Sequence, residues 1–140
     1  MVEHRETRLL PHDCAALFDL VCDIERYPQF VPGYVRAQVL QRSDGYLRVE
    51  QAIGIGAAVI TFHSEAELQR PGRITIHAAD GPFKRLVVEW QFTPVGSHCR
   101  VEFCVAYQLH GVLAPLVSAW LKLTAPRLLD AFVQRAAGTV

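Results

Sequence analysis

The sequence lacks a hydrophobic run that could cross a membrane. No segment approaches the roughly 20 consecutive apolar residues that a spanning helix needs. The first residues, Met1 to Glu6, are largely charged and polar, and they contain no apolar signal core. We therefore expect a cytoplasmic protein.

An excess of charge of either sign is also missing. Fourteen basic and fourteen acidic side chains give a formal net charge of zero. A protein that binds nucleic acid mainly through its phosphates carries a basic excess, so we expect no DNA partner. A local basic patch is still compatible with this balance.

Motifs that mark catalytic and metal sites are absent as well. The six histidines are scattered, and the chain has no HExxH, GxSxG, P-loop or GxGxxG motif. The four cysteines show no CxxC spacing, and we expect buried free thiols. These absences predict a protein that is not an enzyme and that holds neither a metal nor a cofactor.

What the chain does contain is enough apolar material for one folded domain. It has 140 residues, of which 51% are hydrophobic and 20% are charged. This composition excludes a disordered chain, and the length fits a single domain. Because no linker and no internal repeat interrupts the sequence, we expect one domain over residues 1–140.

Apolar residues recur at every second position through most of the chain, which is typical of strands. The pattern predicts one strand over residues 3–10 and six more, joined by short turns, between residues 34 and 107. Val35, Ala37 and Val39 are expected on one face of the first of these six. On the last two strands, the following residues are expected to face the core: Leu86, Val88, Trp90, Phe92, Val101, Phe103, Val105 and Tyr107.

Helical spacing occurs in two places. A short helix is expected after Pro11, and a long one near the end of the chain, where apolar residues recur in steps of three and four. The apolar residues of the long helix are Leu113, Leu116, Val117, Trp120, Leu121, Leu128, Ala131 and Phe132. Pro126 is expected to kink this long helix. The order of elements predicts an α+β fold, in which the long helix covers the apolar face of an antiparallel sheet. One helix is too narrow for so wide a sheet, so we expect an apolar cavity between them.

The segment from Asp23 to Pro32 is too apolar for a linker and too rich in proline for a plain helix. Tyr27, Phe30 and the nearby Tyr34 supply three aromatic rings within eight residues. Proline fixes the backbone here, so the segment must form a shaped corner. Two interpretations are open: the corner closes one end of the core, or it forms the rim of a ligand pocket.

A second unusual segment runs from Gly81 to Leu86, at a predicted hairpin tip. Phe83 stands there between Pro82 and two cations, Lys84 and Arg85. One interpretation is an ordinary turn whose phenylalanine packs back on the sheet. The other is a docking tip, with Phe83 and Phe30 flanking an entrance and the two cations contacting anionic headgroups.

These two segments, together with residues 130–136, resemble the coenzyme Q-binding START family of the polyketide cyclase-like helix-grip superfamily. This family includes the mitochondrial coenzyme Q chaperone and bacterial ribosome association toxins. The resemblance covers essentially the whole chain and implies a seven-stranded antiparallel sheet that grips a long C-terminal helix, with one or two short helices after the first strand. The sequence departs from many relatives at Gly33-Tyr34 and at Pro126.

The resemblance implies a non-catalytic carrier of ubiquinone, or a similar polyprenyl lipid, that supports respiration and transiently contacts the inner membrane. The alternative that it implies is a toxin that binds the large ribosomal subunit and blocks subunit joining. The predicted docking residues are Lys84 and Arg85. The predicted ligand-binding residues are Tyr27, Phe30, Tyr34, Val49, Ile60, Phe62, Phe83, Val88, Trp90, Phe103, Trp120 and Leu121.

Overall fold

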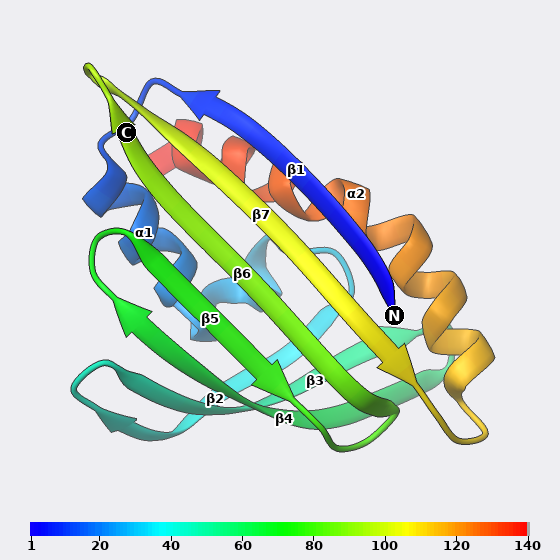
Figure 1. Cartoon of the computed structure of the whole chain (residues 1–140). Helices are drawn as coiled ribbons and strands as arrows, with labels where there is room; N and C mark the ends of the chain where they lie inside the picture. The colour runs from blue at the N-terminus through cyan, green and yellow to red at the C-terminus, as the bar shows by residue number, and fades with distance from the viewer. Residues whose placement is uncertain (140) are drawn as a thin grey trace.

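The computed structural model describes residues 1–139, which form a seven-stranded antiparallel sheet with a long helix across one face (Figure 1). The predicted domain extends to Val140, which lies outside the described residues. The strands are β1 (Val2–Leu10), β2 (Tyr34–Ser43), β3 (Tyr46–Ile55), β4 (Ala58–Gln69), β5 (Arg73–Ala78), β6 (Phe83–Val95) and β7 (His98–Leu109). The helices are α1 (Cys14–Cys22), the 3-10 helix η1 (Ile24–Gln29) and α2 (Ala114–Thr139).

The sheet has the order β1-β7-β6-β5-β4-β3-β2, so β2 to β7 form a meander and β1 pairs with β7 at one edge. Trp90 on β6 pairs with Phe103 on β7, and both side chains are buried under α2. The expected core face of these two strands is confirmed, although Val88 is only half-buried. Period-two alternation therefore predicted correctly which residues face the helix.

The same alternation is wrong for Val35. The register of β2 against β3 shifts between Tyr34 and Arg36, which marks a β-bulge. The extra residue sends Tyr34 toward the core and leaves Val35 on the outer face, 53% exposed, where it lies against Gly54. Ala37 returns to the inner face beyond the bulge.

Helix α2 runs unbroken through Pro126, and Figure 1 shows its path curving over the sheet. The predicted apolar face is confirmed for Val117, Leu121 and Phe132, which are buried, and is wrong for Leu113 and Leu116, which are exposed. The reason is geometric, because Leu113 lies in the turn before α2 and Leu116 is about 100° around the helix from Val117. The buried residues of α2 are Val117, Leu121, Thr124, Ala125, Leu129, Phe132 and Ala136.

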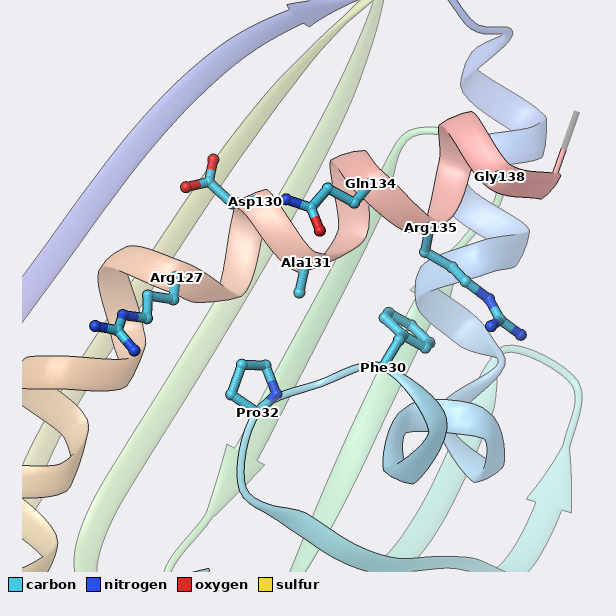
Figure 2. A pocket seen from close by; sticks show the side chains of 8 residues that line it. All are labelled: Phe30, Pro32, Arg127, Asp130, Ala131, Gln134, Arg135 and Gly138. Atoms are coloured by element: carbon cyan, nitrogen blue, oxygen red, sulfur yellow. The ribbon is translucent and has the colours of Figure 1, made fainter.

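The corner predicted after α1 is formed by η1 and Gly33. Figure 2 shows Phe30 and Pro32 beneath the last turns of α2. Gly33 has a φ of +81°, and a Cβ added to it would lie 2.5 Å from the indole ring of Trp120. Both observations require glycine at this position, because Trp120 fills the space that a side chain would need.

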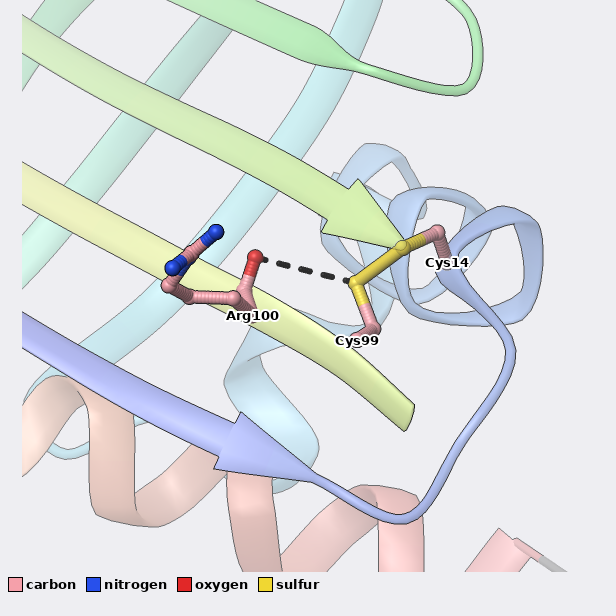
Figure 3. Close-up of a disulfide and its surroundings, with 3 residues drawn as sticks. All are labelled: Cys14, Cys99 and Arg100. Carbon is pink, nitrogen blue, oxygen red and sulfur yellow. Dashed lines mark hydrogen bonds between the residues drawn. A yellow bond between two sulfur atoms is a disulfide. The ribbon is translucent and has the colours of Figure 1, made fainter. Parts of the chain in front are cut away.

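A disulfide joins the start of α1 to the start of β7 (Figure 3). Cys14 and Cys99 have Cα atoms 5.2 Å apart, and 85 positions separate them in the sequence. The prediction of free thiols is therefore wrong for this pair, because only the packing of α1 on the sheet brings the two cysteines together. Cys22 and Cys104 are free, but they are half-buried rather than buried.

We expect alkylation of the unfolded, unreduced protein to label two cysteines, Cys22 and Cys104. A disulfide sulfur does not react with the reagent, so prior reduction should raise the number of labels to all four cysteines. Intact mass followed by peptide mapping measures both numbers. Labelling of all four without reduction would contradict the Cys14–Cys99 bond.

Candidate functional site

Phe132 is the centre of an aromatic cluster that joins α2 to the corner and to the sheet. Its ring centroid lies 5.2 Å from that of Tyr27, 5.1 Å from that of Phe30 and 5.0 Å from that of Trp90. All three pairs meet edge to face, an arrangement favoured because the positive ring edge faces a negative ring centre. The Tyr27 hydroxyl donates to the Val21 carbonyl, which holds this ring in place. The corner therefore closes one end of the core.

An apolar cavity of about 80 Å³ lies between the sheet and α2, next to this cluster. Its volume is well below the roughly 300–1,000 Å³ of typical small-molecule pockets. Six of the predicted ligand-binding residues line it: Tyr27, Tyr34, Phe62, Val88, Trp90 and Phe103. The other lining residues are Ile24, Val31, Gln51, Ile76, Leu86, Val105, Leu128 and Phe132. A ligand-binding role for these residues stays a prediction.

The other predicted ligand-binding residues do not line this cavity. Val49, Ile60 and Leu121 are buried in the surrounding core. Phe30 lies outside the cavity on the far side of Phe132, and Trp120 lies over Gly33. Phe83 is buried against Phe62.

One wall of the cavity carries a short chain of hydrogen bonds. The Tyr34 hydroxyl donates to Gln51 Oε1 at 2.7 Å, and Gln51 Nε2 donates to Ser64 Oγ at 2.6 Å. Gln51 and Ser64 are both buried. The Tyr34 hydroxyl is protonated at neutral pH, and because burial raises its pKa above the ordinary value, it remains a donor further into the alkaline range than a free tyrosine does.

Sequence reasoning missed Gln51, Ser64 and Phe132. The sequence did contain a signal for the two polar residues, because each stands at an inward position of an alternating strand. Gln51 lies between the inward residues Val49 and Ile53, and Ser64 follows Phe62 by two residues. A polar residue at an inward position has to find a buried partner. Phe132 belonged to the predicted apolar face of the helix, but its contact with the corner depends on the tertiary fold.

An open groove of about 830 Å³ lies on the other side of the Phe30–Phe132 pair (Figure 2). Phe30 and Pro32 form one wall, and the last four turns of α2 form the other. Arg135 holds the corner to the helix, with its guanidinium 5.1 Å from the Phe30 ring centroid and a 2.9 Å hydrogen bond to Gln29 Oε1. Since Phe132 lines the cavity and Phe30 lines the groove, this ring pair is the partition between them.

The predicted docking tip differs from the expectation. Phe83 is 2% exposed and packs on Phe62 at 4.9 Å between ring centroids, so it is not an apolar tip. It also pairs with Leu109 at the end of β7, ahead of α2, whereas Phe30 meets Phe132. At a rise of about 1.5 Å per residue, Phe132 is about 27 Å along α2 from Ala114. Phe83 and Phe30 therefore do not flank one entrance.

The two cations that follow Phe83 are exposed at the start of β6. Lys84 and Arg85 make no ion pair with any of the described acidic side chains within 4.0 Å. Their docking role stays a prediction. Within residues 1–139, no three histidine, cysteine or acidic side chains gather in a way that could hold a metal ion.

The model of the polyketide cyclase/dehydrase and lipid transport family matches residues 10–133. The chain belongs to this family. A ribosome association toxin, RatA of Pseudomonas aeruginosa, is 34% identical over 137 residues, which cover 94% of this chain and 93% of the toxin. The mitochondrial coenzyme Q-binding protein COQ10 homolog B of Xenopus laevis is 27% identical over 96% of this chain and 58% of its own length.

A solved structure extends the likeness of the fold to an enzyme. The Zhui aromatase/cyclase of Streptomyces sp. R1128 superposes with a TM-score of 0.84 over 97% of this chain and 93% of its own. At 12% identity this likeness concerns the fold alone. The helix-grip architecture and the resemblance to coenzyme Q-binding and ribosome association proteins are thus confirmed.

The hydrogen-bond chain predicts an effect on stability. We expect Gln51→Leu to lower the free energy of unfolding by about 1–3 kcal/mol, because Tyr34 and Ser64 lose their buried partner. Urea denaturation measures the change. Gln38→Leu is the matched control, since Gln38 is exposed on β2, and its effect should stay within about 0.5 kcal/mol. Equal losses in the two variants would contradict a stabilising role for the chain.

Proposed function

We propose that this protein binds ubiquinone, or a similar polyprenyl lipid, between its sheet and α2, and delivers it without catalysing a reaction. The observation that carries the proposal is the hydrogen-bond chain Tyr34–Gln51–Ser64, whose first two members line an otherwise apolar cavity. A quinone has the matching chemistry, with carbonyl oxygens on an apolar ring. The coenzyme Q-binding relative supports the same ligand class.

The polar chain can recognise a carbonyl because it has donor capacity left. The Gln51 amide carries two N–H groups, and one of them is engaged by Ser64. The second can donate to a ligand carbonyl, and the apolar lining contributes about 25 cal/mol per Å² of buried ligand surface. Within the proposal, Gln51 orients the ring and Trp90, Phe103 and Val88 enclose it.

The size of the cavity makes entry depend on movement. At about 80 Å³ it is too small for a substituted quinone ring with its tail. The Phe30–Phe132 pair separates it from the outer groove, so parting these rings joins the two spaces. We propose that the ring enters through this partition and that the tail follows the groove, with Arg135 closing the corner on Phe30 afterwards.

A cavity-filling variant tests the ligand site. Short-chain ubiquinone should quench the fluorescence of Trp90 saturably, measured in a Trp120→Phe background. Val88→Phe fills the cavity and should weaken binding at least tenfold, with a stability within about 1 kcal/mol of the parent. The matched control is Val87→Phe, whose side chain lies on the opposite face of β6 and should leave binding unchanged.

Two results would overturn the carrier proposal. One is an absence of quenching at saturating quinone in the parent protein. The other is equal binding by Val88→Phe and Val87→Phe, which would place the ligand outside the cavity. Lipid extraction and mass spectrometry of the purified protein identify the ligand that it carries.

A second function is favoured by the bacterial toxin relatives. We propose as the alternative that the protein associates with ribosomes, as the ribosome association toxins are named for doing, and that it does so through the large subunit. Lys122 and Arg127 on α2 are the exposed cations that such a contact would use. The zero net charge weakens this alternative, because ribosomal RNA attracts a basic surface.

Sedimentation with purified ribosomal subunits separates the two functions. If the alternative holds, the protein should pellet with large subunits at low salt, and its affinity should fall steeply as salt rises. Charge reversal by Lys122→Glu with Arg127→Glu should lower that affinity at least tenfold. The absence of co-sedimentation at low salt would remove this alternative and leave the carrier proposal standing.

A further inference from the structure

Two loops at one end of the sheet are joined and expose an apolar side chain. His110 donates its backbone N–H to the Pro82 carbonyl at 3.0 Å, and its ring Nε2 lies 3.2 Å from the Gly81 carbonyl. Gly111, with a φ of +85°, then turns the chain toward α2. Val112 projects from this turn and is 97% exposed, so a valine stands almost wholly in water.

The apolar surface continues from this turn along the outer side of α2. Leu113, Leu116 and Leu123 are all exposed, Leu123 by 67%. At 3.6 residues per turn, these three fall within an arc of about 80° on the helix. Leu116 and Leu123 lie about 100° or more around the helix from Val117 and Leu121, which are buried, and Leu113 lies in the turn before the first helical residue, Ala114. Helix α2 and the turn before it therefore carry a second apolar stripe that the described residues leave partly or largely exposed.

The charged side chains of the segment that carries this stripe are basic. No aspartate or glutamate occurs between Glu102 and Asp130, whereas Lys122 and Arg127 lie within that stretch. Lys84 and Arg85 add two exposed cations beside the joined loops, since Phe83 pairs with Leu109. The one acidic residue of the β5–β6 loop, Asp80, is engaged by His63 at 2.7 Å.

We propose that Val112, Leu113, Leu116 and Leu123, with the cations Lys84, Arg85 and Lys122, form a surface that docks on an anionic lipid bilayer. The proposal rests on the carrier function above and deepens it, because a lipid carrier must meet a membrane. It moves the apolar contact from Phe83, which is buried, to Val112 and the outer stripe of α2. None of the described helices could cross a bilayer, so the contact is peripheral.

The chemistry of the surface favours a bilayer over a protein partner. The exposed apolar side chains project along a convex helix and a loop tip, and a bilayer accepts such side chains without a shaped pocket. Exposed cations that make no ion pair with the described acidic side chains suit a surface of phosphate headgroups, whose attraction acts within a Debye length. Arg85 lines a surface pocket with Glu65 and Asp80, whereas Lys84 and Lys122 do not line it. A second copy of this chain would bring the same cations face to face and is disfavoured by their repulsion.

Vesicle sedimentation of the quinone-free protein tests the docking surface. We expect binding to phosphatidylcholine vesicles with about 30% phosphatidylglycerol and much weaker binding to phosphatidylcholine alone. Val112→Ser with Leu116→Ser should weaken binding at least tenfold. Lys84→Glu with Arg85→Glu should weaken it at least twentyfold at low salt and flatten its salt dependence.

Matched controls lie at the other end of the strands. Leu9 is 57% exposed and pairs with Arg100 at the start of β7, so Leu9→Ser should leave vesicle binding within twofold. Arg42→Glu with Arg100→Glu changes the net charge as much as the docking double variant does and should have a clearly smaller effect. Circular dichroism and thermal melting of every variant should match the parent, since all these side chains are exposed.

The outcomes also separate this proposal from the carrier function. Val88→Phe should still bind vesicles, and Val112→Ser with Leu116→Ser should still bind short-chain ubiquinone in solution. If the parent protein binds vesicles but not quinone, the proposal that it carries a quinone is overturned and the proposed docking surface remains supported. Three results would overturn the bilayer proposal. The first is equal binding to neutral and anionic vesicles, and the second is an equal loss of vesicle binding in Lys84→Glu with Arg85→Glu and in Arg42→Glu with Arg100→Glu. The third is a dimer, seen by light scattering, that Val112→Ser dissociates.

Discussion

The edge-to-face packing of Phe132 against Tyr27, Phe30 and Trp90 is the contact on which the interior of this protein depends. One helical side chain touches the corner on one side and the centre of the sheet on the other. Because the three partners come from η1, its C-terminal end and β6, the contact sets how closely the C-terminal half of α2 approaches the sheet. The size of the cavity and its separation from the outer groove follow from that approach.

A buried chain of hydrogen bonds beside this cluster is the polar feature of an otherwise apolar interior. Buried hydroxyl and amide groups are costly unless they are paired, and Tyr34, Gln51 and Ser64 pair with one another. The two halves of α2 then differ in character. Its C-terminal half closes the interior through Phe132 and Arg135, whereas its N-terminal half presents exposed leucines and no acidic residue. In our proposals, ligand binding and membrane docking belong to different halves of one helix.

Much of the fold could be predicted because strand and helix periods are local properties. Alternation correctly placed Trp90, Phe92 and Phe103 on the face beneath α2, and it failed at Val35, where a bulge inserts one residue. The candidate site was harder to predict from the sequence than the fold was. The corner was recognised from its prolines and aromatic residues, but Phe83 was open to two interpretations, and the structure supports packing on the sheet. The Cys14–Cys99 bond gave no signal in the spacing of the cysteines.

The sequence by itself determined which side of each element is apolar, because side chains alternate every two residues on a strand and recur every 3.6 on a helix. It also determined where the chain turns, through glycine and proline. Only the tertiary structure decided which of these surfaces meet. Gln51 reaches Ser64 diagonally across β3 and β4, because the register pairs Gln51 with Phe62 and Val49 with Ser64. Phe30 reaches Phe132 across about a hundred residues, and His110 joins the β5–β6 loop. Such pairs depend on strand register and on the path of α2, which are set by the packing of the whole chain and not by any local pattern.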